Sequence, residues 1–333
     1  MRFPRREFLR LGAAAVAAPA LPRLASAQVW PNRVVRLIVG FPPGGGADSA
    51  ARIAAGRLSE IWGQQVVVEN KGGAGGNIAH DTAAHAAPDG HTMLFATPTY
   101  TLNTAMKVAS YDLLKEFAPV ANIGLISYAL VAHASVPAKS VTELVAYAKQ
   151  NPGRLNCASA GIGTVPHLAC EYLNKIAGTN ILHVPYRDVN SAMMATVGNV
   201  TQMFFGVSTT AKSQIESGAL NGLAVSTAQR SILLPTLPTM MESGYPSFNI
   251  PGWGGFLATA GTPKDVVEKL NAEVQRAVQR PDLQRRLIAA GMEPPPPQDP
   301  AEFRKFVESD IARWTQFVEA VGVEKLKGDV PAQ

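Results

Sequence analysis

Short apolar runs alternate along this chain with longer stretches in which apolar residues recur every three or four positions. The short runs predict strands and the longer stretches predict helices, so the alternation is typical of an α/β protein. The expected strands are Val34–Val39, Gln65–Glu69, Thr92–Ala96, Pro119–Ala132, Leu155–Ala158, Ile181–Val184, Met203–Val207, Leu223–Ser226 and Trp253–Thr259. The expected helices include Asp48–Trp62, Ile78–Ala86, Ser140–Gln150, Thr164–Ala177 and Ser191–Val197.

After Thr262 the pattern is almost entirely helical. The segments 262–265 and 299–302 both read as helix starts, each with a capping residue, a proline and an acid. The apolar stripes that follow, such as Val266, Leu270 and Val274, indicate ordinary core packing. A chain of this length usually divides into two domains.

The N-terminal segment has the features of an export signal rather than of a folded domain. A twin-arginine pattern at Pro4–Arg10 is followed by the apolar run Gly12–Ala18 and by Ala25-Ser26-Ala27, which resembles a cleavage site. The apolar run is far shorter than a membrane span. We expect residues 1–27 to be a signal peptide that directs the protein to the periplasm by the twin-arginine route.

The charge of the chain argues against a nucleic-acid partner once the leader is set aside. The leader carries five arginines and one glutamate, a net of +4, so only +1 of the chain's formal +5 remains for the mature protein. A nearly neutral chain has no general attraction for phosphate backbones. No later apolar run reaches membrane length, so the mature protein is expected to be soluble.

The chain has two cysteines, Cys157 and Cys170, and the periplasm expected for the mature protein permits disulfides. The first falls on an expected strand and the second on the following helix, with Cα atoms near the upper limit for a bond. A disulfide and a pair of buried free thiols both stay open, and the spacing favours the free thiols.

A glycine-rich turn between an expected strand and an expected helix is the first candidate for a binding site. Such a turn presents backbone N–H groups at a helix N-terminus, which is an arrangement that holds anions. The sequence 43–48 (PGGGAD) lacks the lysine of a Walker loop and the third glycine of a dinucleotide fingerprint. It therefore suits an anion better than a nucleotide.

A second turn of the same kind occurs at Ala158–Thr164, again between a strand and a helix, with His167 one turn into the helix. Two such turns could hold one anion from opposite sides without any charged side chain. A third glycine cluster, Lys71–Asn77, adds another possible nest of N–H groups. Each cluster taken alone could equally be only a tight turn.

Enzyme chemistry is hard to assemble from the remaining residues. The histidines show no metal-binding spacing, there is no G-x-S-x-G elbow, and neither cysteine has a Cys-His signature. Asp48 could be a functional acid, although capping its own helix is the preferred reading. We expect no metal, no cofactor and no catalytic residue.

Seven segments in order resemble the solute-binding proteins of tripartite tricarboxylate transporters, the Bug or TctC family. They are RLIVGFPPGGGADSAAR, VVVENKGGAGGNIA, PDGHTMLF, NCASAGIGTVPHLA, HVPYRD, LAVSTAQRSILLPTLPT and GWGGFLATAGTP. The resemblance covers nearly the whole chain from Trp30 to the C-terminal helices. It implies a two-lobed, type II-like periplasmic binding protein, with two sheets flanked by helices and a ligand cleft between the lobes.

The resemblance also implies the lobe limits and the ligand-binding residues. Residues 28–131 and 251–333 would form lobe 1, and residues 132–250 would form lobe 2. Backbone N–H groups of the two glycine-rich loops, with bridging waters, would hold the ligand. The expected ligand-binding residues are Pro43, Gly44, Gly45, Ala47, Asp48, Asn77, Thr97, Ala160, Gly161, Gly163, Thr164, His167, Tyr186, Arg187 and Phe205.

Two positions depart from the family pattern. The segment 185–192 lacks the family's glycine and second proline, and Phe205 stands where an aspartate is common. Phe205 would make the pocket more apolar if it faces the cleft, and would otherwise be a core residue. Arg187 would pair with a second carboxylate of the ligand or lie in solvent beside Asp188.

The sequence thus favours a monomeric periplasmic receptor that delivers a small organic acid to membrane transporter subunits. The acid would be a di- or tricarboxylate, an acidic amino acid or an aromatic carboxylate. The alternatives are a ligand sensor for a signalling partner and, less favoured, an enzyme that uses the glycine-rich loops. The sequence identifies neither the ligand nor the transporter.

Overall fold

The computed structural model describes residues 30–73, 76–107 and 111–322. The expected signal peptide and part of the third glycine cluster lie outside these residues. The chain divides after Asn32, and the residues from Arg33 onward form one compact unit. None of the helices in the described part of the chain has the length and hydrophobicity of a membrane span.

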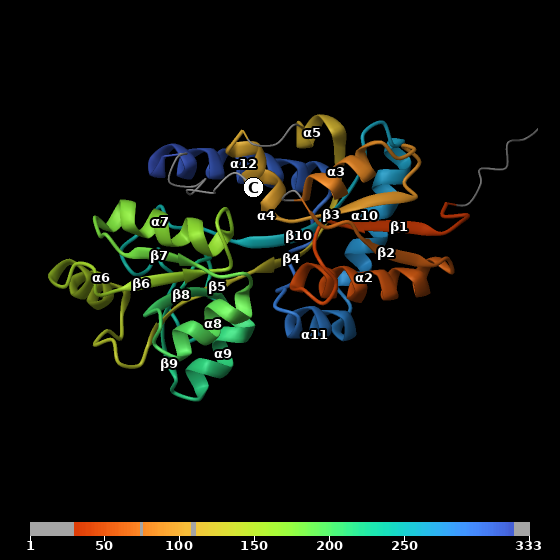
Figure 1. The fold of residues 1–333 in the computed structure, drawn as a ribbon. Helices are drawn as coiled ribbons and strands as arrows, with labels where there is room; N and C mark the ends of the chain where they lie inside the picture. Colours follow the sequence, from red (N-terminus) through yellow and green to blue (C-terminus); the bar gives the residue numbers. More distant parts are fainter. Residues whose placement is uncertain (1–29, 74–75, 108–110, 323–333) are drawn as a thin grey trace, which may run out of the picture. The chain divides into compact units, whose positions relative to one another are not determined.

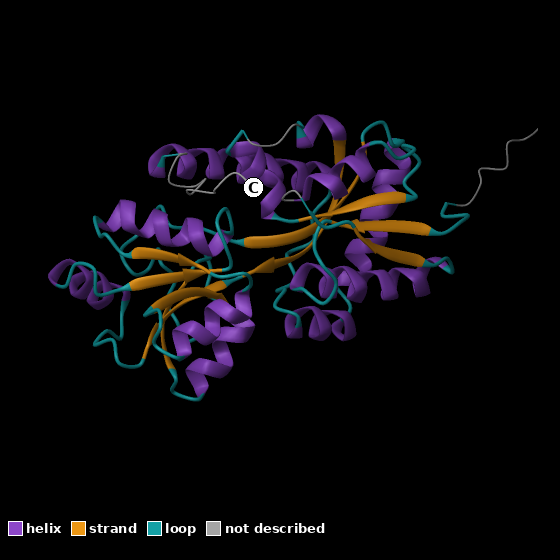
Figure 2. Ribbon diagram, viewed as in Figure 1, coloured by secondary structure: helices purple, strands orange, loops and turns teal. Residues whose placement is uncertain are grey.

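Two five-stranded mixed sheets form the centre of this unit (Figures 1 and 2). The expected α/β fold with two sheets is confirmed. In spatial order the first sheet contains β2 (Val66–Asn70), β1 (Val35–Val39), β3 (Thr92–Ala96), β10 (Gly252–Thr259) and β4 (Phe117–Ile126). The second contains β7 (Leu182–Pro185), β6 (Asn156–Ser159), β8 (Met203–Val207), β5 (Tyr128–His133) and β9 (Leu220–Val225).

The two sheets share one connectivity. Three strands run parallel in each, β2-β1-β3 in the first and β7-β6-β8 in the second. An antiparallel strand, β10 or β5, then separates this group from the last strand. The parallel strands of each sheet therefore end at one edge, which is where α/β folds bind ligands.

Helices lie on both faces of each sheet in Figure 1. The parallel strands need them because a crossover between parallel strands is long enough to form a helix. They are α2 (Gly46–Trp62), α3 (Asn77–Ala84), α4 (Pro98–Ala105), α5 (Leu113–Glu116), α6 (Val141–Gln150), α7 (Val165–Ala177), α8 (Val189–Val197), α9 (Ser208–Glu216), α10 (Lys264–Val278), α11 (Pro281–Ala289) and α12 (Pro300–Val321).

The expected strand Pro119–Ala132 is two strands, β4 in the first sheet and β5 in the second, separated at Ser127. Its apolar run is continuous because both halves are buried, so periodicity could not reveal the change of sheet. The strand β5 therefore begins the second sheet at Tyr128. The lobe limits given above stay a prediction.

The chain passes between the sheets twice, and the two crossings are hydrogen-bonded to one another. Ser226, which is fully buried, accepts a hydrogen bond from the Tyr128 N–H at 3.2 Å and donates one to the Ile250 carbonyl at 2.7 Å. The Ile250 N–H also donates to the Ser226 carbonyl at 2.8 Å. One serine thus joins the outgoing strand β5 to the segment that returns to β10.

The last helix, α12, contributes to the cores of both sheets. Phe303 and Val307, near its start, pack in the first-sheet cluster with Trp253. Trp314 and Phe317, near its end, pack in the second-sheet cluster, where the Phe317 ring lies 3.8 Å from that of Tyr172 on α7. Its start is fixed by the expected capping box, in which Asp299 and Glu302 exchange hydrogen bonds.

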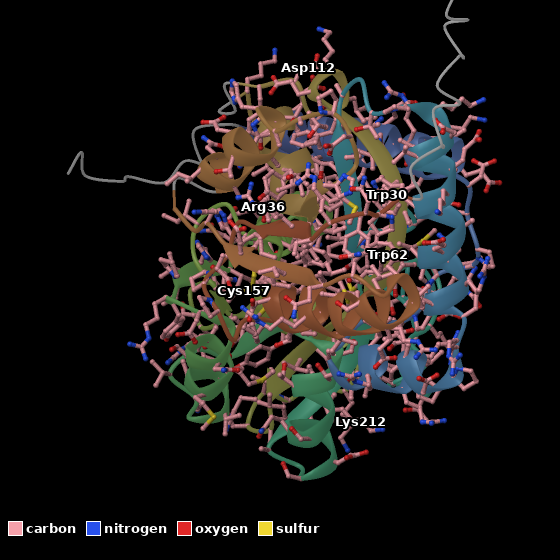
Figure 3. The ribbon with its side chains drawn as sticks, turned by 90° about the vertical axis from the view of Figure 1, so that its right-hand side faces the viewer. Trp30, Arg36, Trp62, Asp112, Cys157 and Lys212 are labelled. Atoms are coloured by element: carbon pink, nitrogen blue, oxygen red, sulfur yellow. A yellow bond between two sulfur atoms is a disulfide. The ribbon has the colours of Figure 1, made fainter. Side chains whose placement is uncertain are left out.

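Cys157 on β6 and Cys170 on α7 form a disulfide, so the free thiols favoured from the sequence are wrong (Figure 3). Their Cα atoms are 6.3 Å apart, inside the range that a disulfide spans. The ideal spacing between a sheet and a helix predicted a longer Cα–Cα distance, near the upper limit for a disulfide, because it does not include how closely α7 packs on β6. The bond encloses the whole second glycine-rich loop.

Removing the disulfide is expected to destabilise the protein without changing the fold. Loss of a closed loop of this length raises the entropy of the unfolded chain and lowers the free energy of unfolding by about 3 kcal/mol. The double variant Cys157→Ala/Cys170→Ala tests this by urea unfolding, with wild type measured with and without reductant. Wild type should lose stability in reductant and the variant should not; a wild type indifferent to reductant would contradict the bond.

Candidate functional site

A cavity of about 520 Å³ is lined by elements of both sheets. Its first wall comes from the loop after β1, from the start of α4 and from β10. Its second wall comes from the loops after β6 and β7, from the helix starts that follow them and from the end of β8. The lining residues are 41–43, 45–47, 97–99, 164–166 and 187–189, together with Ile126, Tyr128, Ala160, Val207 and Trp253.

The cavity lies where the parallel strands of both sheets end. Each of β1, β3, β6 and β7 is followed by a short loop and a helix, and β8 runs directly into α9; residues at these strand-to-helix junctions line the cavity. Five helices, α2, α4, α7, α8 and α9, therefore begin at or beside it. The first N–H groups of a helix have no carbonyl partner within the helix, and together with the helix dipole they attract anions.

Four of these five helix starts have no side-chain cap, although in α9 the Ser208 N–H already donates to the Ser127 carbonyl at 2.9 Å. The N-cap residues of α2, α4, α7 and α9 accept no capping hydrogen bond in the described structure. In α8, by contrast, Asp188 accepts the Ser191 N–H at 2.7 Å, so this helix start already has its anion. The remaining starts come from both sheets, which suits an anion held between them.

The first glycine-rich loop is held from behind by Asp48. This buried carboxylate accepts hydrogen bonds from the Gly44 N–H at 2.8 Å, from Asn70 at 2.8 Å and from Arg52 at 3.0 Å. Burial by itself would raise the pKa of Asp48, but these three donors outweigh it and lower the pKa below its usual range. Asp48 is thus a charged anchor inside helix α2, which begins earlier than expected, at Gly46.

The second loop is held by neutral groups. The Gly161 N–H donates to the Ser159 hydroxyl at 3.1 Å, and the Gly163 N–H donates to Nδ1 of His167 at 3.1 Å. Both glycines have positive φ, +116° and +75°, which other residues adopt only with strain. Their N–H groups are therefore used inside the protein, and the helix start beyond them lines the cavity.

Arg187 and Asp188 are the charged residues among those that line the cavity. The Arg187 guanidinium lies 3.0 Å from the Asp188 carboxylate, and 88% of its side chain is exposed. An ion pair so exposed contributes little to stability, so the guanidinium is free to take another partner. The sequence left open whether Arg187 would face a ligand or lie beside Asp188. In the structure Arg187 lines the cavity and pairs with Asp188, and its contact with a ligand stays a prediction.

Neutral polar groups complete the walls. The hydroxyl of Thr97 is buried and has no hydrogen-bond partner among the described residues, which is unusual for a buried polar atom. Burial raises the pKa of Tyr128, so its hydroxyl stays a neutral donor. The indole of Trp253 is fixed from behind, since its Nε1 donates to the buried carboxylate of Asp310 at 2.8 Å.

The structure brings about half of the expected ligand-binding residues to this cavity. Those that line it are Pro43, Gly45, Ala47, Thr97, Ala160, Thr164 and Arg187. They come from both glycine-rich loops, from the start of α4 and from the loop after β7. Whether they contact a ligand stays a prediction.

The other expected residues lie outside the lining. Gly44, Asp48, Gly161 and Gly163 shape the loops from behind, and Asn77 and Tyr186 are not among the lining residues either. Phe205 is fully buried in the second-sheet core, with its ring 5.5 Å from that of Phe248, which settles its position in favour of the core. His167 lines a different cavity, of about 500 Å³, together with His183.

Several lining residues are absent from the sequence-based set. The start of α4 (Pro98 and Thr99) carried a detectable signal, because a proline directly after a buried strand marks a helix start. Tyr128, Trp253 and Val207 carried none, since apolar residues on buried strands look alike whether they face a core or a cavity. Within the described residues no group of histidine, cysteine and acidic side chains could hold a metal ion.

Comparison with known proteins gives the family. The profile described as "Tripartite tricarboxylate transporter family receptor" matches residues 50–323. A protein of Pseudomonas sp. (strain P51), named UPF0065 protein in tcbD-tcbE intergenic region, is 35% identical over 293 residues, which cover 87% of each chain.

Solved structures agree in fold. The R. palustris protein Rpa4515 with adipate has a TM-score of 0.77 at 32% identity and is matched over 88% of this chain and 98% of its own. MatC from Rhodopseudomonas palustris with bound malate gives 0.74 at 31%, over 87% and 100%. The periplasmic binding protein BugD gives a TM-score of 0.75 at 33% identity, over 89% of this chain and 99% of its own.

The matched family is one of receptors rather than enzymes, BugD is a periplasmic binding protein, and the resemblance found in the sequence motifs is confirmed. The matches extend over nearly the whole described chain. The protein belongs to the family of tripartite tricarboxylate transporter receptors.

Proposed function

We propose that this protein captures a small organic carboxylate in the cavity between its two sheets and presents it to the membrane subunits of a tripartite tricarboxylate-type transporter. The observation that carries this proposal is the convergence of four uncapped helix N-termini, two from each sheet, on one cavity. A carboxylate offers several lone pairs to N–H donors that approach from opposite sides.

Binding would also explain how the lobes close. The starts of α2 and α4 belong to the first sheet, and those of α7 and α9 belong to the second. Only a conformation that brings both groups to one ligand gains all the contacts, so the ligand favours the closed state by its differential affinity. Ordered waters can complete the bonds that the N–H groups do not reach directly.

The walls favour a ligand with an apolar body. Phe41, Ile126, Val165, Val207 and Trp253 line the cavity, and Arg187 is its cation. An apolar acid would bury its body against these side chains while the helix N-termini take its carboxylate. Arg187 would take a second carboxylate, as in the dicarboxylates adipate and malate that two of the structural relatives bind.

The remaining parts of the proposal follow from the sequence and the family. Relatives of this chain are periplasmic binding proteins, and we propose the periplasm for this protein, with the twin-arginine route suggested by Arg5 and Arg6. We propose residues 28–127 with 251–333, and residues 128–250, as the lobes of a monomer; the first limit moves from 131 to 127 because β5 (Tyr128–His133) belongs to the second sheet.

A carboxylate panel tests the function directly. Mature protein is expected to melt at a higher temperature with at least one of adipate, malate, glutamate, citrate, hexanoate and benzoate. A ligand at 100 times its dissociation constant stabilises by about 2.7 kcal/mol, which a thermal-shift assay detects. A larger shift with adipate than with hexanoate would show that the cavity accepts a second carboxylate. Shifts with nucleotides and none with any acid would overturn the proposal.

The substitution Gly46→Pro removes one N–H group from the start of α2 while leaving the helix intact. Proline suits the first position of a helix, and Gly45 before it has φ −76° and ψ 169°, the extended conformation that a proline requires. Loss of one hydrogen bond to a charged ligand costs about 1.5–3 kcal/mol, or roughly a tenfold to hundredfold loss of affinity. Calorimetry with the acid that wild type binds best measures it.

The matched control is Gly46→Ala, which adds a methyl group but keeps the N–H. A Cβ at this position meets nothing within 4 Å. The alanine variant should therefore bind nearly as well as wild type. Equal affinities of the proline and alanine variants would show that the Gly46 N–H is not a ligand contact.

A further inference from the structure

Two histidines stack behind the second glycine-rich loop, outside the ligand cavity. His167 comes from the first turn of α7 and His183 from β7, and their ring centroids are 4.0 Å apart at an interplanar angle of 28°. His167 is only 2% exposed. Both line the separate 500 Å³ cavity, so neither is placed to contact a ligand between the sheets.

His167 binds the loop through a defined ring nitrogen. Its Nδ1 lies 3.1 Å from the Gly163 nitrogen, and the backbone N–H can only donate. Nδ1 must therefore be an unprotonated acceptor, which places the proton of the neutral ring on Nε2. A protonated His167 has no acceptor to offer, so the imidazolium form cannot make this bond.

His183 reaches the same loop through Ser159. Its Nε2 lies 2.6 Å from the Ser159 hydroxyl, and that hydroxyl also accepts the Gly161 N–H at 3.1 Å and lies 3.1 Å from the Gly161 carbonyl. Either tautomer of His183 satisfies the hydroxyl. The two histidines thus each fix one of the two glycines that give the loop its shape.

These hydrogen bonds are important for the loop because glycine restricts the backbone less than any other residue does. A loop with positive φ at Gly161 and Gly163 has many other conformations available. Ala160 on one side of this pair and Thr164–Pro166 on the other line the ligand cavity. A change of loop conformation would move these lining residues directly.

We propose that His167 and His183 are positioning residues that hold the Gly161–Gly163 segment in its binding conformation, and that His167 does so only as a neutral imidazole. The proposal deepens the proposed function, on which its binding arm alone rests. The conformation of the loop can be measured without any ligand.

The surroundings keep both rings neutral. Burial, with the neighbouring His183 as a second cause, lowers the pKa of His167 to about 3, and burial lowers the pKa of His183 to about 4. Glu171 and Lys175 on α7 are the charged groups that line the same cavity. Because these folded-state pKa values are lowered, both rings are neutral at neutral pH, and the His167 anchor of Gly163 is lost as the pH falls through the His167 pKa of about 3.

Paired variants separate the hydrogen bond from the bulk of the ring. His167→Asn keeps an acceptor near the position of Nδ1, whereas His167→Leu removes it. His183→Gln likewise keeps a polar atom near Nε2, whereas His183→Leu does not. The matched control is His85→Asn, because His85 is an exposed histidine at the end of α3 and does not touch this loop.

Amide exchange of the ligand-free protein, followed by NMR, is the first measurement. The Gly163 amide should exchange at least tenfold faster in His167→Leu than in wild type, with His167→Asn between them, and the Gly161 amide should respond in the same way to the His183 variants. Wild-type protection of the Gly163 amide, corrected for intrinsic exchange, should stay constant from pH 7 to pH 5 and fall as the pH passes through about 3, with circular dichroism reporting the fold at each pH.

Affinity is the second measurement, with whichever of adipate, malate, hexanoate and benzoate wild type binds best. Both leucine variants should lose at least tenfold in affinity, while His167→Asn and His183→Gln recover part of it and His85→Asn loses none. Two results would overturn the proposal: unchanged amide exchange in the leucine variants, or wild-type protection that is lost already between pH 7 and pH 6.

If the leucine variants exchange faster but wild type binds no acid, the positioning role is upheld and the carboxylate function is refuted.

Discussion

The rest of this structure depends on one constraint: the helices that follow the parallel strands begin with N–H groups that have no partner within the helix. A parallel strand must be followed by a crossover helix, and every such helix begins with N–H groups that lack a partner inside it. Two sheets of matching connectivity place these helix starts against one cavity. The attraction for an anion therefore arises from backbone geometry, and the side chains decide only the shape and polarity of what accompanies the negative charge.

The two glycine-rich loops reach similar shapes by different electrostatic means. In the first, the charge of Asp48 is balanced by Arg52 and shared among several donors. In the second, imidazole and hydroxyl groups carry no charge at neutral pH. Neither arrangement leaves a net charge behind the loop, so the weak field of the helix starts is not cancelled by a nearby carboxylate or swamped by a nearby cation.

The sequence predicted the fold class well because alternation of apolar strands with helical stripes depends on local patterns alone. It also located both glycine-rich loops, because glycine and proline mark turns directly. It could not show that the N–H groups of Gly44 and Gly163 donate hydrogen bonds within the protein, because this depends on where Asp48 and His167 lie in space. Nor could it separate Tyr128 and Trp253 from core residues, or place Cys170 within bonding distance of Cys157, because these depend on packing between elements distant in the sequence.

Helix α12 has a consequence for the order in which the chain can fold. Trp314 and Phe317, close to the end of the chain, fill part of the second-sheet core against Tyr172 and belong to the same helix as Phe303 in the first-sheet core. Contacts so distant in sequence form late, because a long loop must close before they contribute. The second-sheet core thus stays incomplete until synthesis has passed residue 318. A nascent chain that lacks its last helix exposes that apolar surface to chaperones and proteases.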